Sequence, residues 1–122
     1  MVIVNTVVYV RGNLGGSETD TAIALAGFGL GSMLAALALP GLLEKYPDRR
    51  FMLAGGGLLV IGLLLGLLGP SLPGVIVIWA LLGFGGSLVQ TPAGRLIVRS
   101  SRAGDRPAFY AAQFALSHAC WL

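Results

Sequence analysis

The chain has 122 residues, of which 56% are hydrophobic and only 11% are charged, and its mean hydropathy is +0.85. A soluble domain carries about 25% charged residues, so the composition excludes soluble enzymes and nucleic-acid-binding domains and predicts a membrane protein. The net charge of +3 does not indicate a nucleic-acid partner, because the basic residues lie in short segments between apolar runs. Cys120 is the only cysteine, which excludes an intrachain disulfide and a cysteine-based metal site.

The first uncharged run covers residues 1–10 and would form about 15 Å of helix, half of a bilayer core. It lacks the basic start and the cleavage site of a signal peptide, so we interpret it as a partial span. Ser17 and Asp20 have the spacing of a capping box. They precede the first complete predicted span, residues 21–43, whose length of about 35 Å exceeds the hydrocarbon core of roughly 30 Å.

Residues 51–94 are also uncharged and would give about 66 Å of helix, twice the membrane thickness. A segment rich in Gly and Pro interrupts this run, which predicts a hairpin of two spans, 51–69 and 74–94. Residues 107–122 predict a further partial span of about 24 Å. We expect Asp48 and Asp105 to cap the helices that follow them.

Together these runs predict an all-α membrane protein, a polytopic transmembrane helical bundle that forms one unit over residues 1–122. Helices are favoured over strands because the runs are too long and too continuously apolar for barrel strands. In lipid, helices associate through small residues that allow close backbone approach. The candidates for such contacts are Gly27, Gly31, Ala35, Gly62, Gly66, Gly83, Gly85, Gly86 and Ser87.

The basic residues divide unequally between the predicted loops. Seven of the eight lie in segments 44–50 and 95–106, whereas Arg11 alone lies between the first two helices. Because basic loops remain in the cytoplasm, the sequence places both segments there. The seven are Lys45, Arg49, Arg50, Arg95, Arg99, Arg102 and Arg106.

The loop after the first complete span carries a family resemblance. The run Gly41-Leu42-Leu43-Glu44-Lys45-Tyr46-Pro47-Asp48-Arg49-Arg50 resembles the G-x-L-A-D-R-x-G-R-R loop of the major facilitator superfamily. Gly41, Leu43, Arg49 and Arg50 match that pattern. Lys45 stands at the usual Asp position with Glu44 one residue earlier, and Asp48 replaces the second Gly. This degenerate form resembles the copy in the second half of such transporters.

A second comparison also favours the second half. First halves carry an R-x-x-Q-G pattern, but here Trp79 stands four residues before Gly83 and Leu82 replaces Gln. The resemblance covers the end of helix 7 to the start of helix 11, and the chain is therefore expected to be a fragment with a partial repeat. It implies secondary active transport of a small solute by alternating access, with a proton as one candidate coupling ion. The implied partners are the lipid bilayer and the missing helices of the transporter, in a bacterial inner membrane.

Polar residues inside the predicted spans are candidates for the substrate cavity. Tyr110, Gln113, Ser117 and Trp121 recur at three- and four-residue steps on one stripe of the last helix. His118 lies about 100° away from Ser117 around that helix, and two interpretations stay open: a packing histidine or a proton relay. Four further polar residues are candidates for the same cavity, although hydrogen bonding between helices would explain them equally well: Asn5, Tyr9, Gln90 and Thr91.

Arg49 and Arg50 begin a helix, where basic residues do not favour the helix dipole. Two interpretations therefore stay open for them: positive-inside anchoring by lipid phosphates, or a conformational latch with acidic groups on neighbouring helix ends. Every carboxylate of the chain lies in a predicted loop or at a helix end. We therefore expect a proton-coupling acid, if one is used, to lie elsewhere.

Two alternatives to the fragment interpretation are open. One is a self-contained four-helix protein that dimerises like the small multidrug-resistance exporters, although these depend on a membrane-embedded Glu that this sequence lacks. The other is a non-transporting membrane scaffold. With one histidine, no metal cluster and no nucleophile beside a base, we expect no enzymatic activity, no metal site and no cofactor.

Overall fold

The computed structural model describes residues 2–119, and this part of the chain contains helices and no strand. The predicted class, an all-α membrane bundle, is confirmed. Three of the described helices are long and apolar enough to cross a membrane. In chain order the elements are α1 (Val2–Val7), the π-helix η1 (Val8–Asn13), α2 (Glu18–Leu43), α3 (Asp48–Gly66), α4 (Leu72–Ser100) and α5 (Arg106–Ala119).

Three of the helices extend beyond the uncharged runs, because they also include charged residues that border those runs. α2 begins at Glu18 and α3 at Asp48, and α4 continues through Arg95 to Ser100. Arg95 and Arg99 are therefore helical residues rather than loop residues. This correction has a simple cause: a charged side chain at the end of a span reaches the headgroup region, so the helix does not have to stop there.

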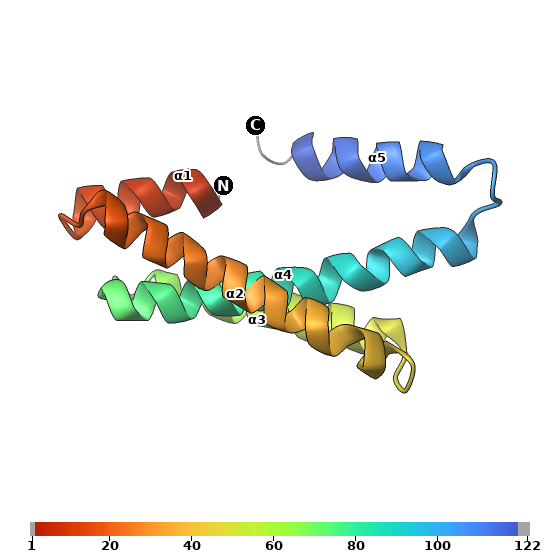
Figure 1. Ribbon diagram of the computed structural model, residues 1–122, viewed down its shortest axis with the longest axis horizontal. Coiled ribbons are helices and arrows are strands. Elements are labelled where there is room, and N and C mark those ends of the chain that lie inside the picture. The colour runs from red at the N-terminus through yellow and green to blue at the C-terminus, as the bar shows by residue number, and fades with distance from the viewer. Residues whose placement is uncertain (1, 120–122) are drawn as a thin grey trace.

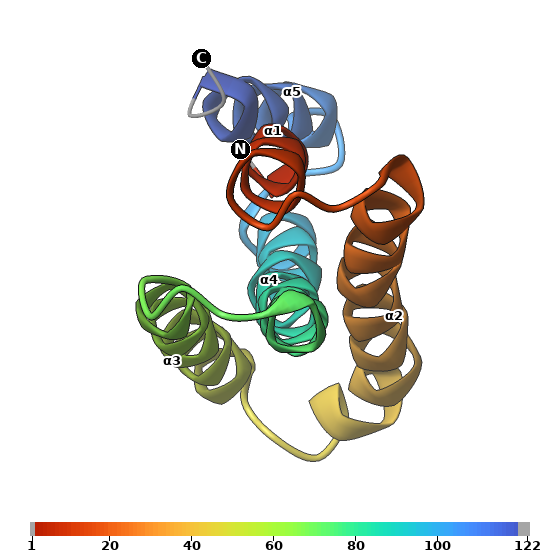
Figure 2. The same ribbon diagram turned by 90° about the vertical axis from the view of Figure 1, so that its left-hand side faces the viewer.

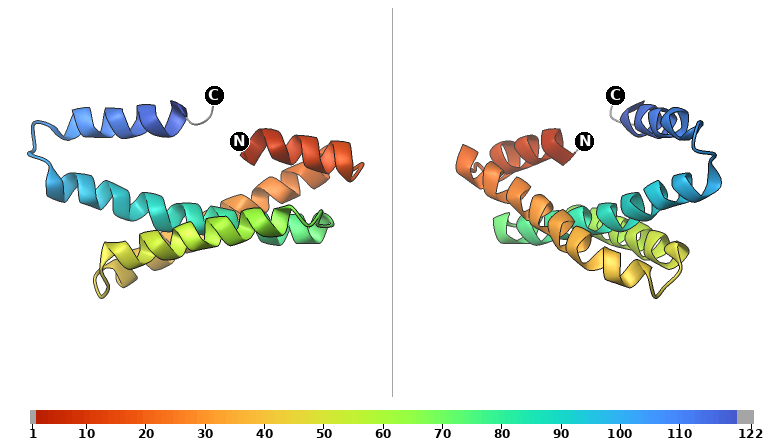
Figure 3. Two further views of the ribbon diagram at one scale, coloured as in Figure 1. Left: turned by 180° about the vertical axis from the view of Figure 1, so that it is seen from behind. Right: turned by 45° about the vertical axis from the view of Figure 1, so that its right-hand side comes forward.

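α4 is the central helix of the arrangement. It packs against α2 on one side and α3 on the other, as Figures 1 and 2 show. α1 and α5 both lie on a third side of α4, approaching it from opposite ends, which is visible again from behind in Figure 3. α1 and α5 therefore lie at opposite ends of this side of α4 (Figure 3).

Glycines set the distance between α2 and α4. A Cβ on Gly27 would lie 2.8 Å from the carbonyl oxygen of Ile76, and a Cβ on Gly31 would overlap the carbonyl oxygen of Ala80. Gly83 of α4 has the same relation to Phe28 of α2. The two backbones therefore touch, as small-residue interfaces in membranes allow.

α3 packs on the opposite side of α4 through Gly55 and Gly85, where a Cβ on Gly55 would lie 2.6 Å from the Gly85 carbonyl oxygen. Gly62 lies against the side chain of Leu82. Gly66 and Gly86, which the sequence also predicted at interfaces, have nothing within 4 Å of an added Cβ. Neither glycine makes a close helix contact within the described part of the chain.

Helix starts follow the prediction in one case and depart from it in another. The Ser17 backbone N–H donates to the Asp20 carboxylate at 2.8 Å and the Asp20 N–H donates to the Ser17 hydroxyl, which confirms the capping box. Asp48 is not a cap, because Pro47 occupies that position of α3 and makes no side-chain cap bond. The Asp48 carboxylate is instead bound by arginines of α4, as described below.

Candidate functional site

A pocket of about 610 Å³ lies between α4 and α5. It is lined by five of the residues that the sequence singled out for the substrate cavity, together with Ala111 and Phe114. The five are Gln90, Tyr110, Gln113, Ser117 and His118. Thr91 is exposed on α4 beside Gln90 but does not belong to this lining. Trp121 and Cys120 lie outside the described residues.

His118 is fixed to its own helix. Its Nδ1 lies 2.8 Å from the carbonyl oxygen of Phe114, and its ring stacks on the Phe114 ring with centroids 3.8 Å apart. Because a carbonyl oxygen only accepts, this contact is a hydrogen bond in the tautomer that carries a proton on Nδ1. The Ser117 hydroxyl donates to the same carbonyl oxygen at 2.9 Å. These bonds orient His118 and Ser117 side by side at one end of the pocket.

Tyr110 joins this pocket to a second one of about 370 Å³. The second pocket is lined by Gly94, Arg95, Val98 and Arg99 of α4 in addition to Tyr110. The Tyr110 hydroxyl donates to the Gly94 carbonyl oxygen at 3.2 Å, and this bond ties α5 to α4. Tyr110 therefore stands between a polar, uncharged pocket and a basic one.

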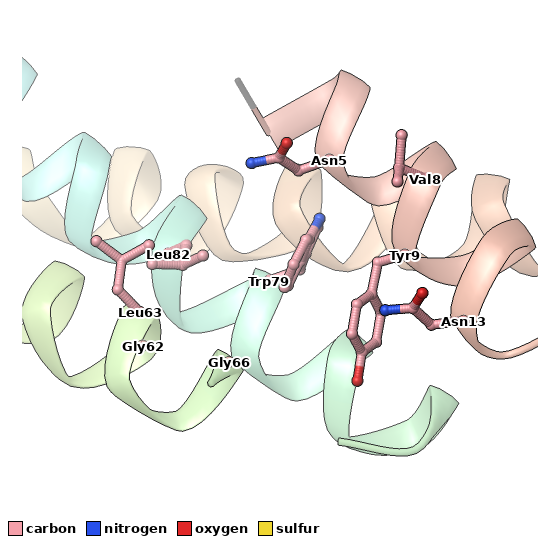
Figure 4. A pocket seen from close by; sticks show the side chains of 9 residues that line it. All are labelled: Asn5, Val8, Tyr9, Asn13, Gly62, Leu63, Gly66, Trp79 and Leu82. Atoms are coloured by element: carbon pink, nitrogen blue, oxygen red, sulfur yellow. The ribbon is translucent and has the colours of Figure 1, made fainter. Parts of the chain in front are cut away.

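Asn5 and Tyr9 line a different pocket, so the structure divides the predicted cavity residues over two places. This pocket has a volume of about 300 Å³ and lies between α1, η1, α3 and α4, as Figure 4 shows. Asn5, Tyr9 and Trp79 line it together with Asn13, Gly62, Leu63, Gly66, Val8 and Leu82.

Two hydrogen bonds hold together the walls of the pocket around Asn5 and Tyr9. The indole N–H of Trp79 on α4 donates to the hydroxyl of the buried Thr6 on α1. The Tyr9 hydroxyl donates to the Pro70 carbonyl oxygen in the α3–α4 turn at 3.0 Å. Tyr9 and Trp79 therefore serve contacts between elements, which is the alternative explanation that the sequence left open for Tyr9.

An ionic cluster around the buried carboxylate of Asp48 lies at the C-terminal end of α4. Asp48 at the start of α3 is only 8% exposed, and its Oδ2 accepts a hydrogen bond from Arg99 at 3.2 Å. Its Oδ1 lies 3.8 Å from Nε of Arg95. Arg95 and Arg99 are one helical turn apart on α4, so both reach the same carboxylate. The cluster joins α3 to α4.

The family model of the Major Facilitator Superfamily matches residues 1–119. The chain belongs to the major facilitator superfamily. Members of this superfamily carry solutes across membranes and are transporters rather than enzymes. Neither the curated proteins nor the solved structures contain a match to the chain.

The loop motif of the superfamily is distributed over two helices and their connection. Gly41 lies in the last turn of α2, and Asp48, Arg49 and Arg50 form the first turn of α3. Glu44 and Lys45 lie in the connection and are exposed. Of the charged residues of this motif, Asp48 makes ion pairs, whereas Arg49 and Arg50 have no acidic partner among the described residues.

Sequence reasoning missed two contacts between helices. The charge pattern predicts a loop over residues 95–106 and so misses the Asp48–Arg99 pair, although Arg95 and Arg99 have the four-residue spacing of one helix face. The Trp79–Thr6 bond was missed because it joins residues 73 positions apart. No local pattern indicates such a contact before the helices are placed.

Proposed function

We propose that this chain contributes to a secondary active transporter that moves a small solute by alternating access. The observation that carries the proposal is the pocket between α4 and α5, where Gln90, Tyr110, Gln113, Ser117 and His118 converge. Polar side chains inside a membrane are costly, and they cluster where they face a substrate path or one another. A pocket with a few placed polar groups among apolar ones is the usual form of a solute site.

The proposal includes further helices beside this pocket. α5 has no buried residue along its described length, and its contact with α4 is carried by few groups. A solute pathway needs walls on all sides, so additional helices of the transporter would cover α5 and complete the cavity. The bilayer, a small solute and these helices are the proposed partners, and a proton is a candidate coupling ion. The proposed location is a bacterial inner membrane.

The proposed orientation places the α2–α3 connection and the 101–105 connection in the cytoplasm. Lys45, Arg49 and Arg50 support it on one hairpin, and Arg95, Arg99, Arg102 and Arg106 support it near the other. Under this orientation the basic pocket beside Tyr110 opens toward the cytoplasm and the polar pocket lies deeper. Tyr110 would then separate the solute site from the cytoplasmic opening.

The Asp48 cluster has a supporting role in this proposal. A latch between the two halves of a transporter needs partners on elements that move apart. Asp48 and Arg99 instead lie on α3 and α4, which pack closely through Gly55 and Gly85. We therefore assign the cluster the role of holding α3 and α4 together while the bundle moves as a rigid unit.

The experiment that tests the proposed cavity compares Gln113→Ala with His118→Gln. Gln113 is half-buried and lines the pocket, so its loss should reduce solute flux at least about tenfold, the effect of about 1.4 kcal/mol of lost binding. His118 is held by the Phe114 carbonyl oxygen and ring, so His118→Gln should leave flux near the wild-type level.

The measurement is flux of labelled small solutes into vesicles that contain the full-length protein, with an ionophore as the control that dissipates the driving gradient. The melting temperature of each variant in detergent separates a loss of transport from a loss of folding. If His118→Gln abolishes gradient-driven flux while Gln113→Ala has no effect, His118 is the proton relay and the assignment of the stripe is wrong.

A further inference from the structure

We propose that the protein binds an anionic phospholipid at the α2–α3 connection, with the headgroup at Lys45, Arg49 and Arg50 and an acyl chain along the outer face of α3. This site differs from the solute pocket, and the inference does not depend on the transport mechanism. It follows from three observations: which basic groups have protein partners, what surrounds the remaining ones, and what lies next to them along α3.

Half of the eight basic side chains already bind an acidic group or a backbone carbonyl oxygen. Arg11 lies 3.4 Å from Glu18, Arg95 and Arg99 share Asp48, and Arg106 donates to the Val98 carbonyl oxygen. Lys45, Arg49, Arg50 and Arg102 have no acidic partner within the described part of the chain. Three of these four lie within six residues of one another in sequence. Positive charge that the protein does not balance is therefore concentrated at one connection.

The acids nearby do not neutralise this group. Asp48 is buried beneath its two arginines, and Glu44 is the remaining carboxylate of the connection. Lys45, Arg49 and Arg50 against Glu44 leave a net excess of positive charge. Arg49 and Arg50 also lie in the first turn of α3, where the helix dipole disfavours cations. A phosphate group beside them would offset this unfavourable charge arrangement.

Aromatic rings support the basic group. The Arg50 guanidinium lies over the ring of Tyr46, 6.0 Å from its centroid. Tyr46 meets Phe51 edge to face at a centroid distance of 6.5 Å. Amphipathic rings such as that of Tyr46 are enriched at the membrane interface. The stack restricts Arg50, and a restricted guanidinium can bind a phosphate through two parallel hydrogen bonds.

The face of α3 next to these cations suits an acyl chain. Leu53, Val60 and Leu64 follow Arg49 at helical spacings of four, seven and four residues and are 65%, 57% and 58% exposed. Gly56 lies between Leu53 and Val60 on the same stripe, and nothing lies within 4 Å of a Cβ added there. Cations at the membrane surface thus continue into an apolar stripe with a notch, a combination that matches a phospholipid rather than a soluble anion.

The test is native mass spectrometry of the full-length protein in detergent, titrated with phosphatidylglycerol or phosphatidylcholine of identical acyl chains. The wild type should bind phosphatidylglycerol at least about fivefold more tightly, the factor that one basic residue contributes near an anionic surface. A triple variant with Lys45→Gln, Arg49→Gln and Arg50→Gln should lose this preference. Arg102→Gln is the matched control, because Arg102 is also basic and exposed, but it makes no ion pair and no cation–π contact with the described residues.

Circular dichroism without added lipid checks that each variant keeps its helix content. If the triple variant loses helix content, the single variants Arg49→Gln and Arg50→Gln carry the test, and each should weaken the preference. Equal binding of the two lipids by the wild type, an unchanged preference in a folded Arg49→Gln or Arg50→Gln variant, or an equal loss in Arg102→Gln would overturn the proposal.

Discussion

The side chain of Asp48 is only 8% exposed, so its carboxylate depends on Arg95 and Arg99 rather than on water for polar contacts. The two arginines contribute unequally. Arg99 donates a hydrogen bond at 3.2 Å, whereas Nε of Arg95 is 3.8 Å from Oδ1, which has no hydrogen-bond partner. Arg99 should therefore contribute most of the stabilisation of the carboxylate.

We predict that Arg99→Gln lowers the free energy of unfolding by about 1 to 2 kcal/mol. Removing one partner of a fully buried ion pair costs about 3 to 5 kcal/mol, and the 68% exposure of Arg99 reduces this effect by solvent screening. Denaturant unfolding in detergent micelles measures the change. Arg102→Gln, a control without an ion pair, should change the value by less than about 0.5 kcal/mol. Equal stability of the Arg99→Gln variant and the wild type would contradict the role of the cluster.

The candidate site shows what residue spacing can predict. Tyr110, Gln113 and Ser117 were grouped from their three- and four-residue spacing, and the structure places all three around one pocket. Asn5 and Tyr9 were grouped with them from polarity alone, and they line another pocket. Spacing within one helix determines which side chains share a face, but the placement of α1 beside α2, with its hydrogen bond to Trp79 of α4, determines which pocket that face meets.

At the scale of the helices, the interfaces of α4 depend on the absence of side chains. Gly31 is buried against the Ala80 carbonyl group, whereas Gly29 on the same helix faces open space. The four-residue spacing of Gly27, Gly31 and Ala35 correctly predicts a buried face of α2, because small residues at this spacing lie on one side of a helix. It could not predict that Gly55, rather than Gly66, contacts α4.

We predict that Gly31→Ala lowers the free energy of unfolding by about 1 to 3 kcal/mol, because the added methyl group forces the α2 and α4 backbones apart. Gly29→Ala is the matched control. It adds the same methyl group to α2 without a neighbour within 4 Å and should leave stability unchanged or raise it by up to about 1 kcal/mol. Thermal unfolding in detergent distinguishes the two, and equal melting temperatures would show that α2 and α4 are not in backbone contact.

Helix boundaries were less predictable from the sequence than helix positions. The sequence predicts that each spanning helix ends at the nearest charged residue, which places the end of the 74–94 span before Arg95. In the structure, α4 continues to Ser100. Conversely, α3 ends at Gly66 rather than at residue 69, because Leu67 and Leu68 close a turn before Gly69, whose φ is +65°. Only glycine adopts this conformation readily, so the turn itself was predictable from the Gly-Pro segment.

For the whole molecule, the distribution of basic residues predicts its orientation. We expect cysteines at Glu44 and Arg102, introduced without Cys120, to react with an impermeant thiol reagent only from the cytoplasm. A cysteine at Gly12, an exposed position with nothing within 4 Å of an added Cβ, should react only from outside. Labelling of intact cells and of inside-out vesicles measures the two accessibilities, and a reversed pattern at any of the three positions would overturn the proposed orientation.

The measurement that tests the central claim most directly is the accessibility of Gln113 from both sides of the membrane. In a transporter that works by alternating access, a cavity residue faces each side in turn. A cysteine at Gln113 in the full-length protein without Cys120 should therefore react with an impermeant reagent from either side of sealed vesicles. A cysteine at Leu64, an exposed position on the outer face of α3, should react from neither. Reaction of the Gln113 position from one side only, or from neither side, would contradict a solute pathway between α4 and α5.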